Sequence, residues 1–408
     1  MLRKAFSVNL TSTYRDKKHK KSKLFGFAGV TLVLMALATS SAWAVPEAAR
    51  YGHFTCTSCH VSPSGGGALT AYGRDFAVSK LSTWSYPGEE SPLNGLIPVS
   101  DRWFVGGDLR GVSMQRRTGD TTFNKNWLMQ ADLELGGVVT SPFFDTGDPI
   151  FGSITIGSKP EGPYVAPESN DQKLMLRAFA LRTDTFDDHL IFRVGAFIPK
   201  YGLMLSDHTM FVRAATGLAP DEEQTQAELT WQDDSLEATL SGLISTKLPE
   251  RDEKTKNGVV ANAAAYWRRN RFNVSVMRVT TAVGTAEKED LSLGISSVVT
   301  LTKRLFAMAE VDRVTSVVTF GGNTSTTSGF ASLYSLHAEV YKGIVPFLRY
   351  EFWDPQLGTK KTSRSRAAAG LIAYPRPHLN VEIRFSQAKS DSSTEPAQQT
   401  DLVAHYYF

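Results

Sequence analysis

Cysteine is scarce in this chain of 408 residues: there are two, and both fall in the stretch HFTCTSCH at residues 53–60. A structural zinc site takes about four ligands, so the lack of a second cysteine pair argues against one. The chain also lacks an excess of either charge, because 44 Lys and Arg face 41 Asp and Glu, for a net charge of +3. That balance gives no reason to expect a nucleic acid as a partner.

Two further absences narrow the class of protein. Beyond Ala44 the chain has no apolar run of the ~20 residues that a membrane-spanning helix needs. The G-x-S-x-G, P-loop and H-E-x-x-H motifs are also absent, so no hydrolase or transferase site is expected. The slightly negative mean hydropathy suits a soluble protein, but it suits equally a membrane barrel with a polar inner face.

The N-terminus has the pattern of a secretory signal peptide. Residues 1–23 are rich in Lys and Arg, an apolar run follows from Leu24 to Ala38, and Ala42-Trp43-Ala44 forms an A-x-A cleavage site. The alternative, a membrane anchor, needs a longer apolar run. The sequence predicts a signal peptide at residues 1–44, cleavage after Ala44 and export of the remainder.

The cysteines and the next residue form the motif C-x-x-C-H, which is the attachment signature of a c-type haem. Two thiols about one turn apart add to the two vinyl groups of haem, and the following imidazole binds the iron. We therefore expect Cys56 and Cys59 to be thioether residues of one covalent haem c and His60 to be its axial ligand. A disulfide is the open alternative in an oxidising compartment. A thioredoxin-like motif would need a βαβ context, whereas the loop 63–67 follows here.

The sixth ligand of such a haem would come from a distant part of the chain, because residues 61–100 contain neither His nor Met. Met204, His208 and Met210 form the densest group of candidate ligands, and of these His208 is the proposed sixth ligand. A histidine in a surface loop is the alternative for His208. His53 lies too close to the cysteines along the chain to reach the other haem face.

Residues 45–86 are predicted to form the monohaem segment, and residues 87–100, which are rich in Pro, Gly, Ser and Glu, are predicted to form a linker. Within the first of these, Arg74 is a candidate partner for a haem propionate, because a guanidinium matches a carboxylate in a bidentate fashion. The alternative for Arg74 is a solvated charge on a helix.

From residue 101 to residue 408 the pattern has a period of two, which is typical of strands with one apolar and one polar face. Trp127, Met129, Ala131, Leu133 and Leu135, for example, are predicted to share one face. About sixteen segments of roughly ten residues alternate in this way. They are 102–113, 125–137, 149–158, 173–183, 189–198, 224–232, 235–245, 258–268, 271–281, 289–300, 304–317, 330–342, 343–353, 364–375, 378–388 and 399–408.

These segments predict a mainly β fold, an antiparallel outer-membrane β-barrel of about sixteen strands with the small haem segment in or at its lumen. Charged residues recur on the polar face, and a water-filled lumen accepts them where the dry core of a sandwich or propeller does not. They include Asp132, Glu134, Arg177, Arg193, Glu310, Asp312, Arg349, Glu351, Glu382 and Arg384. Of the long connections, residues 199–222 are expected to form a surface loop rather than a constriction in the pore.

The stretches AVPEAARYG at 44–52, CTSCH at 56–60 and TAYGR at 70–74, followed by a long barrel, resemble the fused monohaem cytochrome–porins of the bacterial outer membrane. The best-known of these are iron-oxidising outer-membrane cytochromes. The resemblance covers about residues 44–80, and over the barrel it is one of architecture. The sequence differs from that of the iron-oxidising members in YGHF at 51–54 and in the glycine-rich stretch VSPSGGG at 61–67. These differences put iron as the substrate in doubt.

The resemblance implies electron transfer through one haem c between an extracellular redox substrate, such as Fe(II), and a periplasmic electron carrier, such as a soluble cytochrome. The lipid bilayer of the outer membrane would be the other partner. The alternative function is a channel for small solutes whose haem is structural or senses redox state.

Overall fold

The computed structural model describes residues 48, 51, 55–97, 100, 102–139, 149–160, 172–185, 188–205, 207, 209–218, 223–244, 246, 256–283, 286–393 and 395–408. All of them lie in one compact unit, Ser40–Phe408. The predicted signal peptide and its cleavage site lie outside the described residues.

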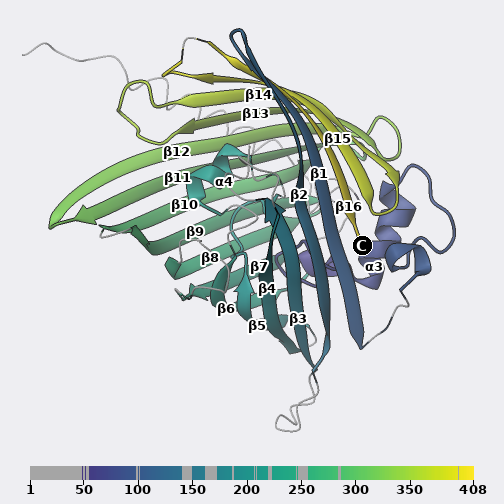
Figure 1. Cartoon of the computed structure of the whole chain (residues 1–408). Helices are drawn as coiled ribbons and strands as arrows, with labels where there is room; N and C mark the ends of the chain where they lie inside the picture. Colours follow the sequence, from purple (N-terminus) through teal and green to yellow (C-terminus); the bar gives the residue numbers. More distant parts are fainter. Residues whose placement is uncertain are drawn as a thin grey trace, which may run out of the picture. The chain divides into compact units, whose positions relative to one another are not determined.

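Sixteen strands form a closed antiparallel barrel, in which each strand pairs with its neighbours in sequence and β1 pairs with β16 (Figure 1). The strands are β1 (Trp103–Thr118), β2 (Thr121–Val138), β3 (Ile150–Pro160), β4 (Gln172–Thr185), β5 (Leu190–Phe197), β6 (Gln224–Gln232), β7 (Leu236–Leu243), β8 (Lys256–Trp267), β9 (Asn270–Val283), β10 (Ala286–Thr300), β11 (Leu305–Phe320), β12 (Asn323–Ala338), β13 (Ile344–Asp354), β14 (Arg364–Arg376), β15 (Leu379–Ser390) and β16 (Ala397–Tyr407). The predicted barrel of about sixteen strands is confirmed, and each observed strand overlaps a predicted segment.

The alternation of residues sorts apolar side chains to the outside of the barrel. On β9 and β10, for example, Val274 is paired with Ile295, and both are exposed while their neighbours in sequence are buried. A closed barrel satisfies its backbone hydrogen bonds without an edge, and an apolar outer face is what lipid requires. The barrel therefore lies in the bilayer of a bacterial outer membrane.

The predicted common face around Trp127 is wrong, because β2 contains a β-bulge. The register with β1 shifts between Arg110 and Gly111, and Met129 has no partner in the ladder. An extra residue in one strand moves the residues beyond it to the other face. Trp127 and Met129 are therefore buried inside, whereas Leu133, beyond the bulge, is exposed on the outside.

Short helices occur between and before the strands. They are α2 (Cys56–Cys59), α3 (Ala71–Phe76), the π-helix η2 (Ala77–Leu81), the 3₁₀-helix η3 (Pro92–Gly95) and α4 (Phe211–Thr216). No helix in the described part of the chain is long and apolar enough to cross a membrane. The first four belong to the N-terminal segment, and α4 packs against β11, β12 and β13.

The N-terminal segment is attached to the barrel at the end where β14 turns into β15. The backbone N–H of Thr83 donates to the carbonyl of Tyr374 at 2.7 Å, and that of Trp84 donates to the carbonyl of Pro375 at 3.3 Å. Within the predicted linker, the Glu89 carboxylate pairs with Arg376, and the Glu89 carbonyl is 3.0 Å from Nε2 of His378. Part of the linker is thus held against the β14–β15 turn.

Because the outward face of the barrel contacts lipid, the free-energy cost of a charged substitution on this face should depend on its depth in the bilayer. Ile295, 53% exposed in the interior of β10, contacts lipid in this fold, so Ile295→Arg should cost about 2–4 kcal/mol of folding free energy. The matched control is Phe320→Arg, at the end of β11 beside the β11–β12 turn, where the cost should be ~0–1 kcal/mol. Equilibrium unfolding in phospholipid vesicles measures both. Equal costs would contradict this placement of the two side chains.

Candidate cofactor site in the barrel lumen

Both cysteines lie on α2, a single helical turn. Cys56 and Cys59 are buried, they occupy positions i and i+3 on one face of the turn, and both are free thiols. His60 ends the turn: its backbone is extended, and its N–H donates to the carbonyl of Cys56 at 2.8 Å. The sequence spacing therefore produces two thiols one turn apart with an imidazole directly after them.

The glycine-rich loop after His60 folds back on the cysteines. Val61 N–H donates to the carbonyl of Ala68 at 3.0 Å and closes the loop. Gly65, Gly66 and Gly67 all have positive φ, between 65° and 78°, a conformation that favours glycine over other residues. A Cβ at Gly65 would lie 3.6 Å from the Cys56 sulfur. The three glycines thus allow the backbone to turn close to the thiol.

The stretch TAYGR places α3 directly against α2. Thr70 is the N-cap of α3: its Oγ1 accepts from Gly73 N–H at 3.0 Å and donates to the carbonyl of Ser58 at 2.8 Å. At Gly73 a Cβ would lie 2.1 Å from the carbonyl oxygen of Cys59. The absence of a side chain at this position is therefore what permits the two helices to touch.

Side chains on the inner face of the barrel hold this loop. Arg193 donates to the hydroxyls of Ser62 at 2.9 Å and Ser64 at 2.7 Å, and it pairs with Glu228 at 2.8 Å. The Glu134 carboxylate accepts from the backbone N–H of Ala68 at 2.6 Å. Further donors to loop carbonyls are Arg182, which reaches Val61, and Lys200, which reaches Pro63 at 2.9 Å. The loop 61–68 thus lies against the inner face of the barrel, whereas residues 83–89 lie at its end, in keeping with the prediction of a segment in or at the lumen.

Cys56, Cys59 and His60 line a cavity of about 320 Å³ between the N-terminal segment and the barrel wall. That volume is within the range of small-molecule and cofactor sites. Its wall is partly apolar and partly charged. The apolar part includes Leu69, Phe76, Leu203, Met204, Met210 and Met308, and the charged part includes Arg110, Arg271, Arg349, Glu382 and Arg384.

Burial keeps the donor groups of this site uncharged. Burial lowers the pKa of His60 to about 4, although the backbone of Gly66 and Gly67 and the charge of Asp108 oppose the shift. Burial, with the neighbouring Cys56, raises the pKa of Cys59 to about 11. A neutral imidazole is the form that binds a metal, and a protonated thiol is a poor nucleophile for disulfide exchange.

Residues 198–205 and 209–218, in the connection between β5 and β6, fold into the barrel, so the prediction of a surface loop is wrong for them. Tyr201, Met210 and Val212 are buried, and the hydroxyl of Tyr201 donates to Asp312 at 2.9 Å. The N–H of Phe211 donates to Glu351 at 2.8 Å. The segment occupies part of the lumen with side chains that complement the inner face.

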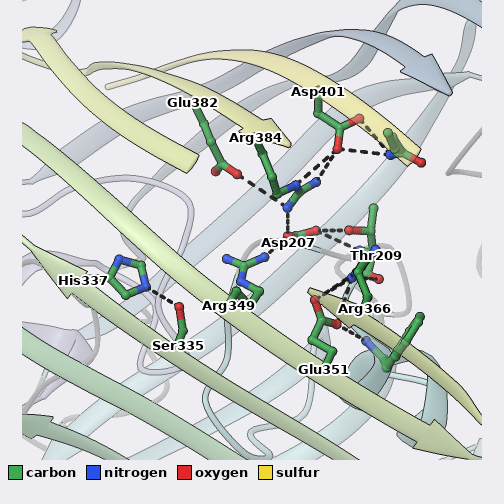
Figure 2. A network of polar contacts seen from close by, with 12 residues as sticks. Asp207, Thr209, Ser335, His337, Arg349, Glu351, Arg366, Glu382, Arg384 and Asp401 are labelled. Atoms are coloured by element: carbon green, nitrogen blue, oxygen red, sulfur yellow. Dashed lines mark hydrogen bonds and ion pairs between the residues drawn. The ribbon is translucent and has the colours of Figure 1, made fainter. Parts of the chain in front are cut away.

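Asp207 joins this segment to the opposite wall through two arginines (Figure 2). Its carboxylate accepts from Arg349 at 2.7 Å and also from Arg384. Arg384 reaches on to Asp401 at 2.9 Å. The lumen charges predicted to be solvated are therefore largely paired with one another, which lowers the cost of burying them.

The remaining site predictions have mixed outcomes. Arg74 is buried, and its guanidinium donates to the carbonyl of Leu69 at 2.7 Å, so a propionate contact stays a prediction. Burial lowers the pKa of Arg74. His208 and His53 lie outside the described residues, while Met204 and Met210 line the cavity.

His337 is a cavity residue that the sequence reasoning did not single out. Its place on the polar face of β12, two residues after the buried Ser335, is a signal that the period-two pattern contains. The pattern could place this histidine inside the barrel, but not in the wall of this cavity.

Comparison with known proteins supports the fold of the barrel. No protein-family model and no curated protein matches the chain. Among solved structures, it is similar to the outer membrane channel DcaP of Acinetobacter baumannii, with a TM-score of 0.55 and 12% identity over 75% of this chain and 97% of that one. It is also similar to an anion-selective porin from Comamonas acidovorans, with a TM-score of 0.56 and 9% identity over 75% and 99% of the two chains. OmpF of Salmonella typhi, in complex with daunomycin, gives 0.55 and 13% over 76% and 98%.

The contact between α2 and α3 predicts that Gly73→Ala disturbs the cysteine segment. The added methyl group would overlap the Cys59 carbonyl, and relieving such an overlap typically costs about 1–3 kcal/mol. Limited proteolysis should cut residues 55–97 faster than in the wild type. Gly111→Ala on β1 is the control, since nothing lies within 4 Å of its added Cβ. Equal cleavage of the two variants would contradict this close contact.

The Asp207 ion pairs predict a change in the pore itself. Asp207→Ala leaves Arg349 without this partner, and removing one member of a buried pair costs about 3–5 kcal/mol. The segment around Asp207 should loosen, and the conductance of single barrels in a planar bilayer should rise. The exposed Asp391→Ala is the control and should leave conductance unchanged. A folded Asp207→Ala variant with wild-type conductance would refute this role.

Proposed function

We propose that this outer-membrane barrel carries one covalent haem c in its lumen cavity and transfers electrons across the membrane. The observation that carries the proposal is the position of the C-x-x-C-H motif. Cys56, Cys59 and His60 lie together on the wall of a cavity that is lined by the inner face of the barrel and by the two segments inserted in it. The motif thus lies inside the membrane barrel.

The residues present fit this group. The two thiols are free and one turn apart, and His60, directly after them, lines the same cavity. Leu69 and Phe76 supply apolar surface in the cavity wall, and Arg349 and Arg384 supply guanidinium groups that match carboxylates such as the propionates. Cys56 and Cys59 would form the thioether bonds, and His60 would be an axial ligand.

When bound, the haem supplies a one-electron redox centre. The protein's part is to hold it in the lumen, to exclude bulk water and to set its potential through ligands and burial. In the proposed direction, an extracellular donor such as Fe(II) loses one electron and becomes Fe(III), while an oxidised periplasmic carrier such as a soluble cytochrome gains one. The reverse direction uses the same residues.

A solute channel is the second candidate function, and the likeness of the barrel to solved porins and to an outer membrane channel favours it. In that case a bound haem would be structural or would sense redox state. The occupation of part of the lumen by the loop 61–68 and by residues 198–205 and 209–218 favours electron transfer over the passage of large solutes.

The two functions differ in what crosses a sealed membrane. Wild-type protein should show the absorbance of covalent haem after denaturing gel electrophoresis, and Cys56→Ala/Cys59→Ala should lose it. In liposomes, the wild type should reduce an enclosed acceptor from an external donor, and the double variant should not. Ser58→Ala, which keeps both thiols, is the control.

Two results would contradict the proposal. A wild-type barrel without covalent haem would exclude the haem reading. A haem-loaded barrel that passes small solutes freely and moves no electrons to the enclosed acceptor would establish the channel reading.

A further inference from the structure

A band of positive charge lies at the end of the barrel to which the N-terminal segment is attached. Three consecutive turns at this end form it, the β8–β9, β10–β11 and β12–β13 turns. We call this band the basic rim, and it consists of Arg268, Arg269, Lys303, Arg304 and Lys342. All are exposed except Arg269, which is half-buried. None of the five pairs with a carboxylate in the described part of the chain.

The lengths of the connections identify this end of the barrel. The three turns of the basic rim join their strands across two, four and five residues, whereas the longest connection of the barrel, residues 198–223, is at the opposite end. Outer-membrane barrels have short turns on the periplasmic side and longer loops on the extracellular side. The basic rim therefore faces the periplasm, where a soluble electron carrier moves.

The basic rim lies beside the cysteine segment and its cavity. The hydroxyl of Thr83, in the N-terminal segment, donates to the backbone carbonyl of Lys342 at 3.0 Å. At the other end of the rim, Arg271 is the second residue of β9, and it lines the cavity together with Cys56. A protein that docks on the basic rim would therefore lie next to the proposed haem site.

The charge changes sign on the two turns that precede the basic rim in the barrel. Asp233 and Asp234 lie in the β6–β7 turn, and the exposed Asp188 lies in the β4–β5 turn. Lipid surrounds the whole barrel, so a band that binds anionic headgroups should continue around it. A protein partner docks on one side and recognises a pattern of both signs. The pattern at this end therefore favours a protein as the partner.

We infer that the basic rim is the docking surface for the periplasmic electron carrier, and that the carrier presents an acidic face around its redox centre. This inference rests on the proposed function, because it names the partner surface for the same electron path. Adjacent strands are ~4.8 Å apart, so neighbouring turns are about 10 Å apart. That spacing is close to the Debye length of ~8 Å at physiological salt, so the charges act together on an approaching partner. Such fields raise association rates by about 10- to 1,000-fold.

The test measures electron transfer from the full-length, haem-loaded protein in a non-ionic detergent to two soluble probes. These are cytochrome c, which is basic, and succinylated cytochrome c, in which the modified lysines make the same protein acidic. At low salt the wild type should react at least ~10-fold faster with the acidic probe than with the basic one. The preference should disappear in about 1 M salt, where the Debye length is ~3 Å.

Charge reversal tests the position of the docking surface. The rim variant carries Arg268→Glu, Lys303→Glu, Arg304→Glu and Lys342→Glu, and it should react at least ~10-fold more slowly with the acidic probe. The matched control makes the same change in net charge at the opposite end of the barrel, with Arg116→Glu, Arg117→Glu, Lys360→Glu and Lys361→Glu, all at exposed positions. The control should keep the wild-type rate. Haem-loaded wild type without a preference for the acidic probe, or a rim variant as fast as the control, would refute this inference.

Binding of the acidic probe, measured by biolayer interferometry, separates this inference from the proposed function. Cys56→Ala/Cys59→Ala should bind the probe as the wild type does, although it transfers no electrons. Wild type that lacks covalent haem but binds the probe more tightly than the rim variant would refute the proposed function and support the docking surface. In nanodiscs that contain phosphatidylglycerol, equal binding by the wild type and the rim variant would assign these charges to lipid headgroups and overturn the inference.

Discussion

Backbone hydrogen bonding in lipid is the constraint on which the rest of this structure depends. At a strand edge inside a bilayer, each backbone N–H or C=O group without a hydrogen bond would cost several kcal/mol of free energy, so the sheet must close on itself. It closes where Asp108–Thr118 of β1 pairs with Ala397–Tyr407 of β16, and the last residue, Phe408, still exchanges two backbone hydrogen bonds of 3.1 Å with Gly107. Closure makes every second residue of each strand face a lumen. The lumen of a sixteen-stranded barrel is too wide for the barrel's own side chains to fill.

That width explains why two separate segments lie inside. Charged side chains on the inner face must find partners once protein displaces water from around them. Arg193 meets Glu228 and the serines of the cysteine loop, while Lys200 meets Glu237 at 2.8 Å and the carbonyl of Pro63. The inserted segments therefore do two things at once. They fill the space, and they complete the hydrogen bonding of a wall that would otherwise need solvent.

The sequence predicted the strands well because their signal is local: alternation over ten residues needs no knowledge of the rest of the chain. It predicted Cys56, Cys59 and His60 as a group for the same reason, since three functional groups within five residues are placed by one helical turn. It failed where the decisive contact is distant. The bulge at Met129 depends on the register with β1, and the inward fold of residues 198–218 depends on acceptors such as Glu351, far along the chain. His337 lines the same cavity as the motif only after the barrel has closed.

The contact between Lys200 and Pro63 links the two inserted segments inside the lumen. What these segments block bears on both candidate functions, the solute channel and electron transfer. The cysteine segment enters from the end of the β14–β15 turn, and residues 198–218 enter from the end where β5 leads to β6. Solute passage needs an open path between these two ends of the barrel. Electron transfer needs only redox groups at suitable separations, and it does not need an open path. Every ion pair that closes the lumen, such as Arg349 with Asp207, therefore opposes conduction of solutes. The same pair also stabilises the wall of the proposed haem cavity. In the proposed function, the segments inside the lumen rather than the strands adapt a barrel of porin type to electron transfer.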